Sequence, residues 1–296
     1  ILDNAKVKDF YVVSPQSYYI LQESFRGVSL FRVNAENNSK ARIYTLKKNE
    51  YISDPFGGYL AEEKGEIYLL VHTQTGSQLI TIQHNKVDRR LLDGVHARNL
   101  AVNGGKIYVS ESKCDYSRIW ELSPAGKKQV ISDSSWIGGF DMRNGSICWS
   151  SSQQGHSSLF LFDLASAETE ELATFSEQCS QPIFADDEHI LFNASLNGVV
   201  NGKMISTETK KITSLTNYRS NILYHQYSSS VFVEYLDRAE KSALFIAEHI
   251  PVPDFFMYDT LYPTYFFSEP NLHEIMTTDS VAANTETEAP YSFQSP

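Results

Sequence analysis

An all-β fold of repeated four-stranded sheets is predicted by three features of the sequence. A short pattern of a glycine followed by an apolar strand begins at Gly65, Gly105 and Gly145, an interval of 40 residues. The apolar runs are short and are separated by turn residues. In each copy a glycine, often after an asparagine, supplies the positive backbone angle that a tight hairpin requires. A repeat of this length and composition is typical of the four-stranded blades of a β-propeller.

The repeat assigns three central blades in chain order. The second, third and fourth blades cover residues 57–92, 99–132 and 138–174. Each contains an inner strand, a glycine turn, an apolar core strand, a third strand and an outer strand. The same order of four strands therefore repeats in three consecutive blades.

The pattern continues at both ends with more variation in its spacing. Apolar strands around Ile190 and Val231 indicate the fifth and sixth blades, and the strand around Tyr19 indicates the first. The interval between the first two blades is longer than the others, which predicts an extended loop near residues 36–40. We therefore predict a six-bladed β-propeller with four-stranded blades over residues 1–250.

Closing such a ring requires a complete sixth sheet, because an open seam leaves unpaired backbone groups. Residues 10–13 are predicted to form the inner strand of blade one. The outer strand of the sixth blade could come from residues 1–8 or from residues 254–259. The sequence does not select between these two segments.

The charge of the chain excludes several classes of partner. The formal net charge is -11, and no cluster of Lys and Arg is present. Nucleic acid and anionic lipid surfaces both favour basic clusters, so neither is expected as a partner. No apolar run is long enough to span a membrane as a helix, and no direct membrane span is predicted.

Candidate catalytic and metal-binding residues are few. None of the three cysteines has another Cys or a His within four residues, so we predict no metal site and no cofactor. Residues 186–188 are an acidic run, but their position between strands predicts a solvated turn. No Gly-x-Ser-x-Gly motif is present. His72, His156 and His225 are predicted to be loop or strand residues, and no catalytic residue is predicted.

The composition changes after Ile250, and residues 251–296 are predicted to form an extended aromatic arm followed by a linker. Prolines interrupt the aromatic stretch, and the residues after Thr277 are polar and acidic. So many aromatics must pack against something. The arm either covers its own propeller, completing the sixth blade, or docks on a partner. The candidate partner-binding residues are Phe255, Phe256, Tyr258, Tyr262, Tyr265, Phe266 and Phe267.

Blade five carries a family resemblance. Residues 182–195 contain a proline and an Asp-rich turn before an apolar strand, and Leu215 and Thr216 close the outer strand. This arrangement resembles the repeat of TolB-like (WD40-like) propellers, and the resemblance covers roughly residues 10–250. It implies a periplasmic or cell-surface setting in a bacterial envelope, associated with the outer membrane, and a binding role.

The leading functional hypothesis is a non-catalytic propeller scaffold for protein-protein interaction in a bacterial envelope complex. Its expected partners are envelope proteins, including an outer-membrane component to which it is tethered. One alternative is a carbohydrate- or peptide-directed enzyme, which would place clustered carboxylates or histidines at the loops around the channel. Another is a domain that binds a small sugar or cell-wall fragment in the central channel. That domain would need aromatic platforms and few acids at the channel mouth.

Overall fold

The computed structural model divides into two compact units, Ile1–Leu261 and Tyr262–Pro296. No residue beyond 247 is described, so the predicted arm and all seven of its candidate partner-binding aromatics lie outside the described residues. The predicted domain boundary after residue 250 stays a prediction. The described residues are 6–37, 39–53, 58–84, 86–113, 116–196, 198–216, 221–228, 231–236 and 243–247.

The described residues form six antiparallel sheets, in which sequential strands are neighbours. Five sheets have four strands and the sixth has three. No helix among the described residues is long and apolar enough to cross a membrane. The strands are β1 (Lys6–Ser14), β2 (Ser17–Ser24), β3 (Gly27–Asn34), β4 (Lys40–Thr45), β5 (Leu60–Glu63), β6 (Glu66–Thr73), β7 (Gly76–Gln83), β8 (Lys86–Leu91), β9 (Ala97–Asn103), β10 (Lys106–Ser112), β11 (Ser117–Ser123), β12 (Gly126–Asp133), β13 (Trp136–Arg143), β14 (Ser146–Gln153), β15 (His156–Asp163), β16 (Thr169–Phe175), β17 (Cys179–Phe184), β18 (His189–Leu196), β19 (Val199–Ser206), β20 (Ile212–Ser214), β21 (Ile222–Ser228), β22 (Val231–Leu236) and β23 (Ala243–Ala247).

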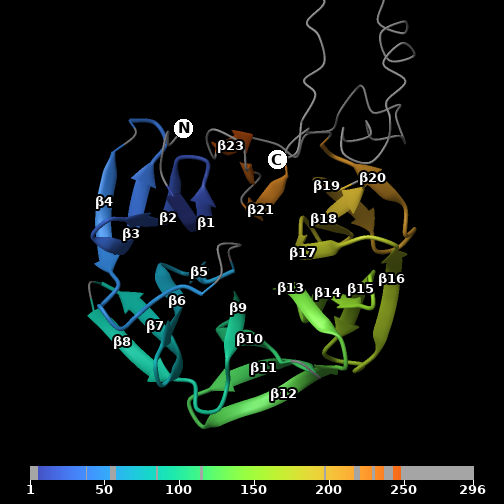
Figure 1. The fold of residues 1–296 in the computed structure, drawn as a ribbon, viewed down its shortest axis with the longest axis horizontal. Helices are drawn as coiled ribbons and strands as arrows, with labels where there is room; N and C mark the ends of the chain where they lie inside the picture. The colour runs from blue at the N-terminus through green and yellow to red at the C-terminus, as the bar shows by residue number, and fades with distance from the viewer. Residues whose placement is uncertain are drawn as a thin grey trace, which may run out of the picture. The chain divides into compact units, whose positions relative to one another are not determined.

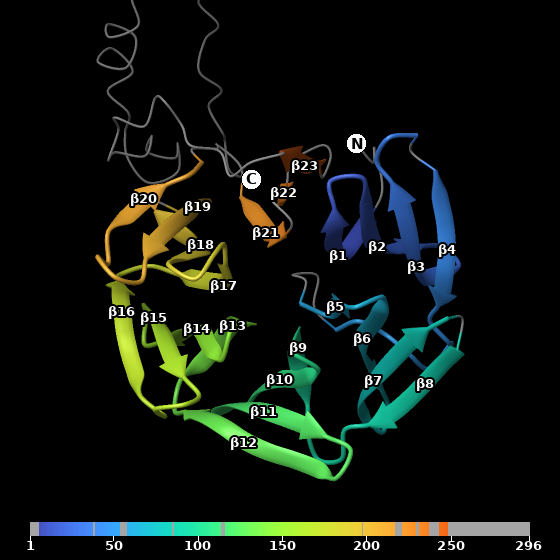
Figure 2. The same ribbon diagram turned by 180° about the vertical axis from the view of Figure 1, so that it is seen from behind.

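The sheets are arranged as blades around a central axis, with the first strand of each blade innermost (Figures 1 and 2). Residues of all six first strands line a cavity along this axis, the central channel. The predicted propeller is therefore confirmed, with the sixth blade represented by β21, β22 and β23. Of the two segments proposed to complete that blade, residues 6–8 belong to β1 in blade one. Residues 1–5 and 254–259 lie outside the described part of the chain.

The repeated hairpins have the geometry that their glycines predict. Lys64 and Gly65 join β5 to β6 with φ values of 53° and 82°, and Asn144 and Gly145 join β13 to β14 with 47° and 84°. Two successive positive φ angles define the type I′ turn, whose twist matches that of the flanking strands. This is why the sequence repeat locates the hairpins so well.

The prediction of an extended loop near residues 36–40 is wrong, because the long connection between blades one and two lies later in the chain. Only residues 35–39 separate β3 from β4, whereas residues 46–59 separate β4 from β5. The long connection is anchored by the buried carboxylate of Glu50, which accepts hydrogen bonds from the Tyr44 hydroxyl at 2.5 Å and the Lys47 N–H at 2.8 Å. Arg89 of blade two also reaches Glu50, at 3.3 Å. The extra residues thus link blade one to blade two.

The core lies between neighbouring blades. The second strands β6 and β14 are buried at five consecutive positions, because each blade packs against a neighbour on both faces. The same packing closes the ring, where Val233 of blade six lies in one cluster with Phe10 and Val12 of blade one. The Val12 N–H also donates to Gln226 Oε1 at 2.7 Å. Blades one and six are therefore joined by apolar packing and by a hydrogen bond.

Candidate functional site

A cavity of about 430 Å³ lies at one end of the channel. It is formed where the inner strands β9, β13, β17 and β21 begin, together with the end of β14 and the start of β19. We call this the inlet cavity, and the face of the propeller at which the inner strands begin the inlet face. The cavity is lined by Arg98, Asn99, Trp136, Ile137, Gly138, Ser152, Gln178, Cys179, Ser180, Gln181, Val200, Asn221, Ile222 and Leu223.

The inlet cavity has a mixed polar and apolar lining with a single charged side chain, that of Arg98. Its lining has four amide and two serine side chains, and none of the described lining residues is an Asp, Glu, Lys or His. The guanidinium of Arg98 lies over the Trp136 ring, 4.1 Å from its centre. Trp136 is 42% exposed, so its indole forms part of the rim. This arrangement suits binding of a polar ligand better than acid-base chemistry.

Gln181 occupies the boundary between the inlet cavity and the deeper channel in an unusual backbone conformation. Its φ is 52°, which is rare for a residue other than glycine. Its Oε1 accepts a hydrogen bond of 2.9 Å from Asn193 Nδ2, and Asn193 Oδ1 lies 2.7 Å from His225 Nδ1. Complete burial lowers the pKa of His225 to about 4, so the ring is neutral and Nδ1 donates to Asn193.

Two carboxylates on inner strands tie neighbouring blades together: that of Asp9, which is buried, and that of Asp141, which is half-buried. Asp9 Oδ2 in blade one accepts hydrogen bonds from the N–H groups of Tyr59, at 2.7 Å, and Leu60, at 2.9 Å, in blade two. Asp141 Oδ2 in blade four accepts from the N–H of Phe184 in blade five at 2.9 Å. Neither carboxylate lines the inlet cavity. Their hydrogen bonds assign them a structural role as latches between blades.

Burial raises the pKa of Asp9 to about 7 and that of Asp141 to about 6, although backbone N–H donors act in the opposite direction. In the range from about pH 4 to about pH 7, folded Asp9 keeps a proton that the unfolded chain releases. The Asp9 contribution to stability is therefore greatest below the unfolded pKa and falls as the pH rises through this range.

We expect the Asp9 contribution to this loss of stability with rising pH to be absent in Asp9→Asn, because the asparagine side chain cannot titrate. Thermal unfolding of the two proteins from pH 4.5 to 8 would measure it, since Asp141 is common to both. The difference in stability, wild type minus variant, should decrease with rising pH. A difference that increases with pH would show that the N–H donors outweigh burial at Asp9.

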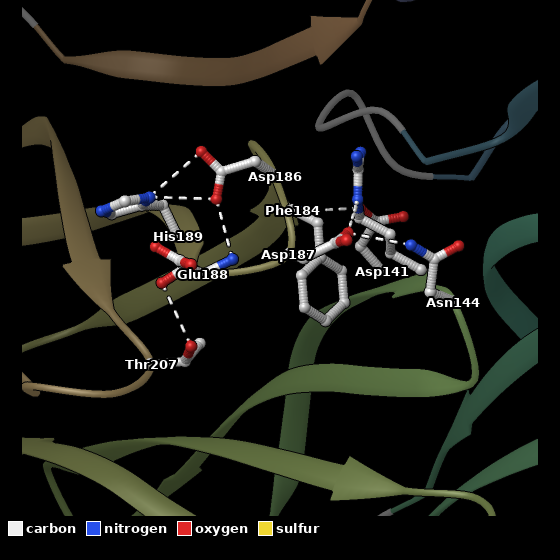
Figure 3. Close-up of polar contacts among 9 residues, drawn as sticks. Asp141, Asn144, Phe184, Asp186, Asp187, Glu188, His189 and Thr207 are labelled. Carbon is white, nitrogen blue, oxygen red and sulfur yellow. Dashed lines mark hydrogen bonds and ion pairs between the residues drawn. The ribbon is translucent and has the colours of Figure 1, made fainter.

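The acidic run of residues 186–188 forms an exposed turn between β17 and β18, as predicted (Figure 3). Asp186 Oδ1 accepts the Glu188 N–H at 2.8 Å and so closes the turn. Asp187 Oδ1 accepts hydrogen bonds from Arg143 Nε at 2.7 Å and Asn144 Nδ2 at 2.9 Å. These contacts join blade five to the β13–β14 hairpin of blade four, on the face opposite the inlet cavity.

The other candidates considered from the sequence are strand residues. His72 lies in β6, and His156 is the exposed first residue of β15. Cys148 and Cys179 are buried free thiols, whereas Cys114 lies outside the described residues. Within the described part of the chain, no group of three or more His, Cys, Asp and Glu side chains could hold a metal ion.

The residues of the inlet cavity were not identified from the sequence. The inner strand of blade four was predicted to begin at residue 138, whereas β13 begins at Trp136, so the sequence did not place this tryptophan at the channel mouth. Gln181 and Asn221 gave no signal, since amides are common in loops and at strand ends.

Comparisons with known proteins identify the fold. No family model and no curated protein matches the chain. A TolB-type protein from Agrobacterium tumefaciens superposes with a TM-score of 0.57 at 14% identity, over 72% of this chain and 78% of that one. A Mycobacterium tuberculosis puromycin-hydrolyzing peptidase gives 0.61 at 5% identity, over 82% and 51%. An oligogalacturonate lyase in complex with manganese gives 0.56 at 12%, over 83% and 76%.

At these identities the likeness concerns the fold alone. The chain spans about half the length of the peptidase that it resembles. The same propeller thus occurs in proteins with different activities, and the fold does not select among them. What the likeness establishes, together with the six sheets, is that this chain is a β-propeller of the TolB-like fold.

Proposed function

We propose that this chain is a non-catalytic scaffold that binds a protein partner through its inlet face. The observation that carries the proposal is the distribution of large, exposed apolar side chains. Among the described residues these are Phe25, Tyr51, Leu91, Trp136 and Ile212. Four of the five lie on the inlet face, and Ile212 lies on the opposite face.

The positions follow from the strand order. Inner strands begin on the inlet face, so second strands end there, third strands begin there and fourth strands end there. Phe25 is in the turn between β2 and β3, Leu91 ends β8, and Trp136 begins β13. Tyr51 pairs with His72 near the end of β6. Ile212, in contrast, begins the fourth strand β20.

Two of these aromatic side chains make a cation–π contact with an arginine. Phe25 is 94% exposed, with the Arg26 guanidinium 5.1 Å from its ring centre, and Trp136 has Arg98 over its ring. Aromatic residues and arginine are enriched in protein interfaces and among the residues that contribute most to affinity. Such pairs on one face favour a protein partner there.

The setting proposed for this interaction is the bacterial envelope. The TolB-like fold and the blade-five resemblance support a periplasmic or cell-surface location, associated with the outer membrane. The arm aromatics proposed from the sequence would add a second contact with the partner or cover the propeller. An enzyme of the carbohydrate or peptide class is the alternative, favoured by the lyase and peptidase that share the fold.

The partner should be lost when the inlet face loses its aromatics. We expect that the double variant Phe25→Ser/Trp136→Ser recovers at least about tenfold less of a stoichiometric envelope protein, after chemical cross-linking, than the wild type. Tenfold corresponds to about 1.4 kcal/mol of binding free energy. Mass spectrometry of the cross-linked species provides the measurement.

Ile212→Ser is the matched control, because it removes an exposed apolar side chain from the opposite face. It should recover the partner as the wild type does. Equal recovery of the partner by the wild type and both variants would show that the inlet face does not bind the partner. Phe266→Ser in the full chain then tests whether the arm makes the contact.

A further inference from the structure

We propose that the inlet cavity is a binding site for an uncharged saccharide. This goes beyond the protein scaffold and does not depend on it. The cavity volume of about 430 Å³ falls within the roughly 300–1,000 Å³ of small-molecule sites. It therefore has room for a ligand much larger than a few water molecules.

The charge of the lining disfavours cationic ligands. The chain has a formal net charge of -11, yet the described cavity lining contains no carboxylate, lysine or histidine. Its one ionic group, Arg98, is stacked on Trp136. A cationic ligand would find no carboxylate among these lining residues. A neutral ligand rich in hydrogen-bonding groups is the better match.

The amides of the lining are oriented by bonds to the fold. Asn99 Oδ1 accepts from the Ser110 hydroxyl at 3.0 Å, and Asn221 Oδ1 accepts from the Val200 N–H at 2.9 Å. The Val200 N–H can only donate, so its bond fixes which end of the Asn221 amide is the oxygen. The NH₂ end of Asn221 is therefore a donor suited to ligand oxygens.

Hydroxyl groups complete the polar lining. Ser180 borders the cavity, and a serine hydroxyl both donates and accepts hydrogen bonds. Sugar hydroxyls have the same dual character. Amide donors beside serine hydroxyls thus match alternating hydroxyl and ether oxygens, whereas a carboxylate ligand would leave the acceptor capacity of the serines unused.

Trp136 supplies an apolar surface at the rim of the cavity. An aromatic ring with a polar N–H suits a ligand with one apolar face and polar edges, and the C–H face of a sugar ring has this character. Its 42% exposure leaves indole surface accessible beside the stacked Arg98. The apolar side chain of Leu223 lines the same cavity.

The base of the site is rigid. Gln181 is held by Asn193, which in turn is held by the buried His225. A preorganised amide loses little conformational entropy on binding. This network makes the proposed site a formed one, ready to accept a sugar without rearrangement.

The test is a titration of the purified full chain, followed by tryptophan fluorescence and by saturation-transfer NMR. The probes are the neutral trisaccharides of glucose and of N-acetylglucosamine, with trigalacturonate and trialanine as charged comparisons. We expect a neutral trisaccharide to bind at millimolar concentration or below. Its dissociation constant should rise at least about tenfold in Trp136→Ala and in Gln178→Ala.

Tyr51→Ala is the matched control, since Tyr51 is an exposed aromatic on the same face that does not line the cavity. It should bind the sugar like the wild type. Gln178 is exposed, so its replacement should leave folding intact. The proposal is overturned if no neutral probe binds, if only trigalacturonate or trialanine binds, or if the cavity variants bind unchanged. The assay contains no protein partner, so failure of the scaffold would not affect it.

Discussion

Asp9→Ala is expected to lower the free energy of unfolding by about 4 kcal/mol. Asp9 is 1% exposed, and its carboxylate accepts three backbone hydrogen bonds, from Tyr59, Leu60 and its neighbour Phe10. Alanine would leave all three N–H groups without this acceptor, and each buried donor left unpaired costs about 1–3 kcal/mol. Water entering the channel would recover part of that cost.

Urea denaturation measures the loss, and two other aspartates calibrate it. Asp88→Ala, on the exposed face of β8, should change stability very little. Asp141→Ala should be intermediate, because Asp141 accepts fewer backbone hydrogen bonds across its blade boundary than Asp9 does. If Asp9→Ala costs less than about 1 kcal/mol, the carboxylate does not latch blade one to blade two.

The architecture could be predicted from the sequence because its determinants are local and repeated. Each of these second strands is packed on both faces and begins with an apolar run, so Ile67, Ile107 and Ile147 recur at one interval. The type I′ turn before each strand requires positive φ angles, which glycine supplies. Both signals survive even where the blades share little other sequence.

The inlet cavity could not be predicted in the same way. Its residues come from four blades and lie mostly where the inner strands begin, but the side chains at these equivalent positions differ from blade to blade, so no sequence pattern connects Trp136 with Asn221. The left-handed conformation of Gln181 depends on how blades four and five pack. Asp9 was missed for a related reason. It stands at an irregularity in the pairing of β1 with β2, where alternation no longer indicates which side chains face the channel.

The packing of blade four against blade five leads to the second large effect, at Gly139. A Cβ atom at this position would lie 3.0 Å from Gln181 Cα and 3.1 Å from its backbone nitrogen. Its φ of 149° also lies where L-residues are strained. Gly139→Ala is expected to cost about 3–4 kcal/mol, since overpacking and a disallowed backbone conformation each contribute about 1–3 kcal/mol.

Gly145→Ala separates the two contributions. Gly145 has a φ of 84°, but a Cβ there would meet no atom within 4 Å, so only the backbone cost of about 1–2 kcal/mol should appear in urea denaturation. Equal losses in the two variants would mean that the backbone of Gln181 yields easily to Gly139. If Gly139→Ala lowers the stability more than Gly145→Ala does, the backbone of Gln181 does not move away from position 139.

The Gly139→Ala protein that does fold should then also bind the proposed saccharide more weakly. The added methyl group displaces Gln181 at the base of the cavity, whereas Gly145→Ala should bind the saccharide normally.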